Sequence, residues 1–260
     1  MTNPIGAGVG ESRNRRGMRP YKCLLADATQ RPSTTLQPMM RMVAFAPVIY
    51  SAGKVFDNLE AGQCPTDEFL ANGSTDGIAS RADLQLLQDL QDAARITLCA
   101  KHDRQPVTAE LVCALNAAMT RSAALHPGQL RRAEQRIGVR TAYGDHMPPA
   151  LTMEKLRALV EDSETESFEP DSMLAQATLL FVRLAKAQPF EDGNKRTAIL
   201  AANALLPEDT VLVVPHDAEA SGEIESAFHD LLARAYIYGD DRAAIHAVVE
   251  FMLAHQPAGE

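Results

Sequence analysis

The chain has 260 residues, of which 46% are hydrophobic, and a formal net charge of -9 with a sequence pI near 5.3. This length can bury one substantial core, or one domain with an extension. The acidic balance disfavours binding to nucleic acid or to a membrane surface, and no apolar run approaches the ~20 residues of a membrane span. Four scattered cysteines without a C-x-x-C pair indicate reduced thiols, so we expect a cytoplasmic protein.

The N-terminal segment differs in composition from the rest. Residues 1–42 carry seven Lys and Arg against two Asp and Glu, and the segment is rich in Gly, Pro, Ser and Thr without a period. This composition predicts a disordered basic tail over residues 1–41. We expect one folded domain over residues 42–258, with its core at about residues 80–206 and an N-terminal extension before it.

The first half of the folded region is predicted to be mostly helical. An apolar run at residues 42–50 opens it, and residues 56–79 are expected to be irregular with one helical turn. From Ser80 a helix is predicted, because apolar residues recur at the i, i+3, i+4 spacing. Thr108 can cap a second helix and a third begins near Thr152, while the Gly- and Pro-rich residues 126–149 between them favour a loop or short hairpin with residues 137–141 extended.

The second half continues the helical pattern. Pro170 and Asp171 are expected to open a helix with Met173, Ala177, Leu180 and Leu184 on one face, and Pro189 ends it. Residues 198–206 are apolar nearly all round, which predicts a central, fully buried helix. Residues 210–214 suit a short strand, and two amphipathic helices end the chain. The predicted fold class is therefore all-α, a helical bundle with a small β element.

The segment Gln188-Pro189-Phe190-Glu191-Asp192-Gly193-Asn194-Lys195-Arg196-Thr197 carries the chemistry. Gly193 lets a ligand approach the main chain, and the following helix directs its free N–H groups and its positive dipole end at the loop. Lys195 and Arg196 add charge for phosphate. Asp192 is a natural ligand for Mg²⁺, which proteins usually hold with one or two carboxylates plus substrate phosphates.

A plainer interpretation is a capped helix start with solvated charges, which is the commoner meaning of a lone Gly-Asn-Lys-Arg. Here buried helices flank the segment on both sides, and an acid and two cations converge on one turn. This convergence favours a site for phosphate and metal.

The segment resembles the signature of the Fic/Doc (Fido) family, His-Pro-Phe-x-(Asp/Glu)-Gly-Asn-(Gly/Lys)-Arg, and departs from it at the histidine. The flanking helices and the segment from His126 to Arg131, followed by Ile137-Gly138, are also similar to the family. The resemblance covers roughly residues 45–255. It implies a Fic-type helical bundle with a small β-hairpin flap that binds ATP and Mg²⁺ and transfers AMP to a protein hydroxyl.

The resemblance also implies roles for individual residues. Asp192 would bind the metal, Gln188 stands at the position of the catalytic histidine, and the two remaining groups are the nucleotide-binding loop and the flap. The nucleotide-binding residues would be Phe190, Gly193, Asn194, Lys195 and Arg196, and the flap that docks a protein target would be Val139, Arg140, Thr141 and Ala142. Lys195 is found in the Doc-type toxins, which transfer phosphate, and Ile199 replaces a second arginine, so the transferred group stays open.

Glutamine cannot hold a proton near neutral pH, and general base catalysis contributes typically ~10²–10⁴-fold. A glutamine can still orient an attacking water in some GTPases. Glu60, at a place that suits the family's inhibitory glutamate, is a candidate regulatory residue or alternative base. His126 and His146 are weaker candidates for a base. His229 and His246 lie in amphipathic helices and are expected at the boundary between the buried and exposed faces.

Three hypotheses follow. The first and favoured one is a nucleotide-binding pseudoenzyme that regulates a partner, with weak or lost transfer. The second is a competent AMP transferase or kinase, or an enzyme that removes AMP, which uses another base. The third is an antitoxin-like or scaffold protein that uses the fold only for contact.

Overall fold

The computed structural model describes residues 41–122, 125–165, 172–217, 221–239 and 242–257. The predicted tail and the Pro170-Asp171 helix start lie outside these residues. The described elements are the helices α2 (Ala46–Asp57), α3 (Gln63–Asn72), α4 (Arg81–His102), α5 (Ala109–Ala117), α6 (Met153–Thr165), α7 (Met173–Ala187), α8 (Asn194–Ala204), α9 (Glu223–Ile237) and α10 (Arg242–Ala254), and the strands β1 (Val139–Thr141) and β2 (Gly144–His146). The prediction of an all-α bundle with a small hairpin is confirmed.

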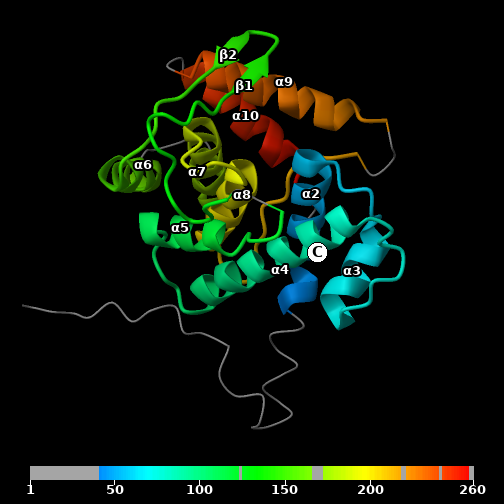
Figure 1. Cartoon of the computed structure of the whole chain (residues 1–260). Helices are drawn as coiled ribbons and strands as arrows, with labels where there is room; N and C mark the ends of the chain where they lie inside the picture. Colours follow the sequence, from blue (N-terminus) through cyan, green and yellow to red (C-terminus); the bar gives the residue numbers. More distant parts are fainter. Residues whose placement is uncertain (1–40, 123–124, 166–171, 218–220, 240–241, 258–260) are drawn as a thin grey trace, which may run out of the picture.

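Helices α7 and α8 form the centre of the bundle (Figure 1). They pack against each other, α2, α4 and α5 contact α8, and α6, α9 and α10 contact α7. Every residue of α8 from Arg196 to Ala204 is buried, which confirms the predicted central helix. Its four alanines after Thr197 leave room for neighbouring helices to approach closely.

Side-chain caps set several helix starts, and those at Ser80 and Thr108 are where the sequence predicts them. Ser80 accepts hydrogen bonds from the N–H groups of Ala82 and Asp83, and Thr108 accepts one from that of Leu111. Ser172 caps α7 in the same way. These hydroxyls satisfy donors that have no partner within the helix. The predicted apolar face of α7 is correct except at Met173, which is 51% exposed because it lies in the first turn.

The expectation of irregular structure at residues 56–79 is wrong, because α3 is a ten-residue helix within this range. Only Thr66, Phe69 and Leu70 are buried in it. Because only two of these buried residues are apolar, the sequence shows no clear helical repeat of apolar residues here. Gly73 ends the helix with a φ of 79°, the left-handed conformation that favours glycine at this position.

The strand predicted at residues 210–214 is also wrong. The segment is buried at Leu212, Val213 and Val214, but it pairs with side chains instead of another strand. Asn203 both donates to the carbonyl of Leu212 and accepts from its N–H, each at 2.9 Å. Gln256 makes the same pair of bonds with Val213. Side-chain amides therefore do here what a neighbouring strand does in a sheet.

The hairpin lies at one end of the bundle beside α9 (Figure 1). Its strands are antiparallel, with Val139 opposite His146. Tyr143 in the turn donates to Asp230 on α9 at 2.6 Å, and Arg234 donates to the Tyr143 hydroxyl at 2.9 Å. In the described part of the chain, no helix has the length and hydropathy needed to cross a membrane.

Asn203→Ala tests the side-chain pairing of residues 210–214. The substitution leaves the main-chain N–H and carbonyl of Leu212 buried without partners, and we expect it to lower the free energy of unfolding by about 2–4 kcal/mol. Denaturant unfolding measures this, with the exposed Asn72→Ala as control, for which a change within about 0.5 kcal/mol is expected. Equal effects of the two substitutions would contradict the pairing.

Candidate functional site

The loop between α7 and α8, residues 188–193, is here called the motif loop. Left-handed residues stand at both ends of it, Gln188 with φ 44° and Gly193 with φ 70°. A Cβ atom at Gly193 would lie 3.2 Å from Asn116 and from Met119. Both the conformation and the close approach therefore require glycine at this position.

Two asparagine side chains fix the motif loop. Asn194 accepts from the Phe190 N–H at 2.8 Å and donates to the Phe190 carbonyl at 3.0 Å. Asn116 donates to the Asp192 carbonyl and to the Thr197 hydroxyl. The Asn194 side chain thus holds the loop, and the Phe190 ring is buried in the core with 1% exposure. Asn194 and Phe190, both predicted to bind the nucleotide, therefore fix the conformation of the motif loop.

Arg131 joins the motif loop to the segments around the hairpin. It is buried, and its guanidinium donates to the carbonyls of Gln188 at 2.7 Å, Gln135 at 3.1 Å and Pro148 at 2.5 Å. Burial lowers the pKa of this side chain, although an arginine keeps its charge in proteins. The hairpin and the motif loop are consequently held in one fixed relation.

A cavity of about 400 Å³ lies beside the motif loop, a volume typical of small-ligand sites. It is bounded by the end of α2, the hairpin, the end of α7, the start of α8 and α9. Its lining residues are Phe56, Asp57, Ile137, Gly138, Val139, Arg140, Thr141, Ala185, Gln188, Glu191, Asp192, Gly193, Asn194, Lys195, Arg196, His229, Leu232, Ala233 and Tyr236. The predicted flap residue Ala142 lies in the turn and does not line the cavity.

The start of α8 makes one side of this cavity electropositive. The first N–H groups of a helix have no acceptor within it, and the helix dipole adds positive potential there. The Lys195 ammonium lies 4.9 Å from the centre of the Phe56 ring. Burial lowers the pKa of Lys195, while nearby Asp57 opposes that shift. An anion placed here would meet main-chain donors and two cationic side chains.

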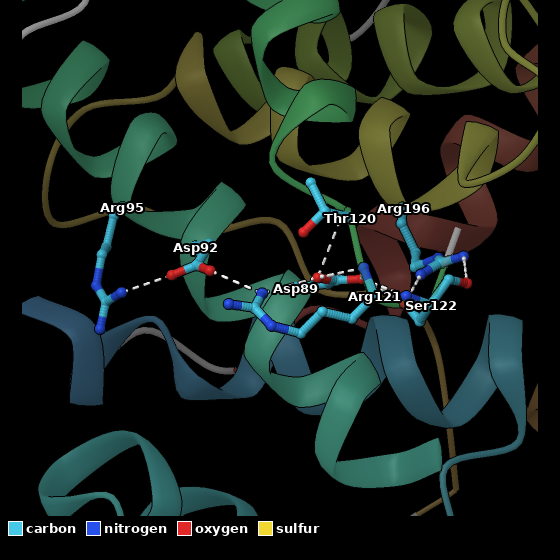
Figure 2. A network of polar contacts seen from close by, with 7 residues as sticks. All are labelled: Asp89, Asp92, Arg95, Thr120, Arg121, Ser122 and Arg196. Atoms are coloured by element: carbon cyan, nitrogen blue, oxygen red, sulfur yellow. Dashed lines mark hydrogen bonds and ion pairs between the residues drawn. The ribbon is translucent and has the colours of Figure 1, made fainter. Parts of the chain in front are cut away.

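Arg196 is the more deeply placed of these cations, with 2% exposure. It donates to the Ser122 hydroxyl at 2.8 Å (Figure 2), and its Nε lies 3.3 Å from Asp57 Oδ2. Its Nη2 lies 3.8 Å from Asp192 Oδ1. Three carboxylate or hydroxyl groups from separate parts of the chain therefore surround one guanidinium.

Asp57 is a site residue that the sequence analysis missed. It is the last residue of α2, where the helix dipole disfavours a carboxylate. No signal in the sequence points to it, because residue 57 falls in the range predicted to be irregular. Burial raises the pKa of Asp57, and Arg196 acts in the opposite direction. Glu60, the predicted regulatory acid, is exposed, does not line the cavity, and uses its main-chain N–H to bond Asp83. The structure thus brings Asp57 to the site and leaves Glu60 outside it.

Asp192 lines the cavity with a side chain that is 58% exposed. Its Oδ1 accepts from the Gly193 N–H at 2.6 Å. Among the described residues, no cluster of three or more His, Cys, Asp or Glu side chains suits a metal. A Mg²⁺ ion at Asp192 would therefore depend on oxygen atoms from a ligand, as is common for this metal.

Gln188 also lines the cavity, and its side-chain Oε1 is buried without a hydrogen-bond partner. Leaving a buried acceptor unsatisfied costs about 1–3 kcal/mol. Such an atom at a cavity wall indicates a partner that comes with a ligand or with water. The side-chain amide of Gln188 cannot take up a proton near neutral pH.

The histidines are placed differently from expectation. His126 bonds Glu191 at 3.0 Å and His146 bonds the Lys186 carbonyl at 2.7 Å, and neither lines the cavity. His229 does line it. Burial, together with the charge of Lys195, lowers the pKa of His229 and favours the neutral imidazole. Sequence periodicity gave no reason to single out this residue.

Comparison with known proteins identifies this arrangement. Residues 106–206, which include α5, α7, α8 and the motif loop, match the model of the Fic/DOC family. Over these residues the chain is therefore similar to the Fic/DOC family. No curated protein matches the chain.

Solved structures share the fold. A Fic domain containing signaling protein from Bacteroides thetaiotaomicron is similar at a TM-score of 0.63 and 19% identity, over 87% of this chain and 86% of that one. Fic-1 (aa134–508) from C. elegans gives 0.62 and 18%, over 88% and 64%, so this chain spans less than two thirds of that fragment. A Fic family protein from Desulfovibrio desulfuricans G20 gives 0.59 and 17%, over 87% and 67%. The predicted Fic-type bundle is confirmed.

Arg131→Lys tests the link between hairpin and motif loop. Lysine keeps the charge but lacks the planar fork that reaches three carbonyls, so we expect the free energy of unfolding to fall by about 2–4 kcal/mol. Urea unfolding measures it beside Arg132→Lys, whose residue is exposed and should change by less than about 0.5 kcal/mol. A neutral Arg131→Lys variant would show that the carbonyls do not need this guanidinium.

Proposed function

We propose that this Fic-domain protein binds ATP with Mg²⁺ in the cavity at the start of α8, and that its transfer of AMP or phosphate to a protein hydroxyl is weak or lost. One observation carries the proposal. The free N–H groups of α8, the Lys195 and Arg196 side chains and the Asp192 carboxylate all meet at one cavity. Phosphate and Mg²⁺ need this combination of donors, cations and a carboxylate.

Each group has a distinct part in this proposal. The main-chain N–H groups of the first turn of α8, with Lys195 and Arg196, would hold the phosphate chain, Gly193 would let it approach the main chain, and Asp192 would hold the metal. Bound ATP would supply the group to be transferred and Mg²⁺ the charge that offsets the phosphates. Position 199, where a second arginine would stand, holds an isoleucine that is fully buried in the core. Helix α8 therefore offers no further cation there, a pattern shared with Doc-type members. The transferred group is therefore AMP or phosphate.

Asp57 opposes nucleotide binding in this arrangement. Its carboxylate lies on the Nε side of Arg196 and lines the same cavity. A phosphate that reaches this guanidinium has to displace a carboxylate that already neutralises it. We therefore expect Asp57 to lower the affinity for any triphosphate.

A protein target would dock on the hairpin. In the described residues, β1 pairs only with β2, so each strand has an unpaired edge that can accept an extended segment. Val139, Arg140 and Thr141 on β1 also line the cavity. A segment paired with β1 would present its hydroxyl beside Gln188 and the motif loop.

A second candidate function, a competent transferase, is favoured by one observation. The neutral imidazole of His229 lines the same cavity as Gln188. A neutral imidazole can accept the proton of an attacking hydroxyl. Under the scaffold hypothesis, by contrast, neither nucleotide nor metal has a place in the cavity.

Thermal unfolding with Mg-ATP tests binding. At a ligand concentration a hundredfold above Kd we expect the melting temperature to rise by about 5–10 °C. EDTA and the Asp192→Ala substitution should each remove most of the rise, and Asp76→Ala, at an exposed acid outside the cavity, should preserve it. No stabilisation of the native protein at saturating Mg-ATP would favour the scaffold hypothesis.

Transfer is tested with ATP labelled at the α or the γ phosphate. We expect little labelling by native protein and a gain of about a hundredfold in Gln188→His, because the histidine restores a general base. The labelled position decides between AMP and phosphate.

The controls for this assay separate the two candidate functions. If native protein labels itself or a target, and Gln188→Ala does not, the pseudoenzyme proposal is wrong. If native labelling is instead lost in His229→Ala, with Mg-ATP binding unchanged, His229 is the base and the second candidate holds.

A further inference from the structure

Asp89 lies behind Arg196, away from the cavity lining. It is on α4, its side chain has 0% exposure, and it accepts hydrogen bonds from the loop after α5 (Figure 2). The donors are the N–H groups of Thr120 at 3.1 Å, Arg121 at 2.9 Å and Ser122 at 2.6 Å, the Ser122 hydroxyl at 2.8 Å and Arg121 Nη1 at 3.0 Å. A buried carboxylate with this many donors is well satisfied.

The Ser122 hydroxyl connects Asp89 to Arg196, and the chemistry fixes the direction of both bonds. A guanidinium has only donors, so Ser122 Oγ accepts from Arg196 Nη1. The hydroxyl has a single proton, which it donates to Asp89 Oδ2. The order of donation is therefore Arg196 to Ser122 to Asp89, and a carboxylate at its end strengthens each step.

A ligand in the cavity would affect the contact of Arg196 with Asp57 and its contact with Ser122 differently. Asp57 is a cavity residue, whereas Asp89 and Ser122 are not. A phosphate that displaces Asp57 would leave in place the bond to the Ser122 hydroxyl and the longer one, at 3.5 Å, from Arg196 Nη2 to the Ser122 carbonyl. Arg196 would then still be held by a hydroxyl polarised by a buried carboxylate.

We propose that Asp89 is a positioning residue, which acts through Ser122 to hold the Arg196 guanidinium toward the cavity for a phosphate chain. The phosphate part rests on the proposed nucleotide binding, while the positioning of Arg196 does not. The simpler alternative is that Asp89 only caps the loop at residues 120–122. The two interpretations differ in the role of Ser122 Oγ. If Asp89 positions Arg196, this atom has to link them; if Asp89 only caps the loop, the link is not needed.

The experiment compares native protein with Asp89→Asn, Ser122→Ala, the double variant and the conservative Ser122→Thr. Asp92→Ala is the matched control, since Asp92 pairs with Arg121 and Arg95 in the same network but does not touch Arg196 (Figure 2). Without ligand, ¹⁵N relaxation of the Arg196 Nη1 group, which contacts Ser122 and not Asp57, reports the order of the guanidinium and is assigned with Arg196→Lys. Titration calorimetry with Mg-ATP reports affinity.

We expect Asp89→Asn and Ser122→Ala each to mobilise the Arg196 Nη1 group and to weaken Mg-ATP binding about tenfold, the size of one charge-assisted hydrogen bond. The double variant should lose no more than either single one, because both interrupt the same connection. Ser122→Thr and Asp92→Ala should match the native protein in both measurements.

Additive losses in the double variant, or a native-like Arg196 signal in Ser122→Ala, would overturn the proposal. So would an Asp89→Asn variant that melts earlier but keeps a rigid Arg196. If Asp89→Asn does not fold, the Ser122→Ala and Ser122→Thr pair decides alone. If native protein does not bind Mg-ATP, the proposed function fails, and the relaxation data still decide on Asp89.

Discussion

The structure around the cavity depends on one buried cation, the guanidinium of Arg196. With 2% exposure it has little water to solvate it, so its charge has to be met by protein groups. Asp57 at the end of α2, Ser122 after α5 and Asp192 in the motif loop meet it. These three segments are far apart in the sequence. Satisfying one charge thus holds the end of α2 and the motif loop, two of the elements that bound the cavity, against the loop after α5.

Polar side chains also replace secondary structure where the backbone is irregular. Asn194 and Asn116 bond the main chain of the motif loop, and Arg131 bonds three carbonyls around it. Asn203 and Gln256 do the same for residues 210–214. Buried main-chain groups need partners, and these amides and the guanidinium supply them. The loops that form the site are therefore tied to the core by side-chain hydrogen bonds, which suits a site that binds a ligand in one geometry.

Local patterns in the sequence predicted the local features. Periodicity from Ser80, the cap at Thr108 and the all-round apolar residues of α8 were sufficient for those helices. The strand at residues 210–214 was wrong because an apolar extended run does not reveal whether its partner is a strand or a side chain. Asp57 was missed because its importance comes from its ion pair with Arg196, and His229 because it comes from its place in the cavity near the charge of Lys195; both partners lie far along the chain.

The central claim is that this cavity holds a Mg-nucleotide through the start of α8. A crystal structure with Mg²⁺ and a non-hydrolysable ATP analogue tests it most directly. The account predicts the phosphate chain at the first turn of α8 in contact with Lys195 and Arg196, Mg²⁺ at Asp192, and Asp57 moved off the guanidinium. An analogue that binds elsewhere, with the Asp57–Arg196 pair intact and the cavity without phosphate, would contradict it.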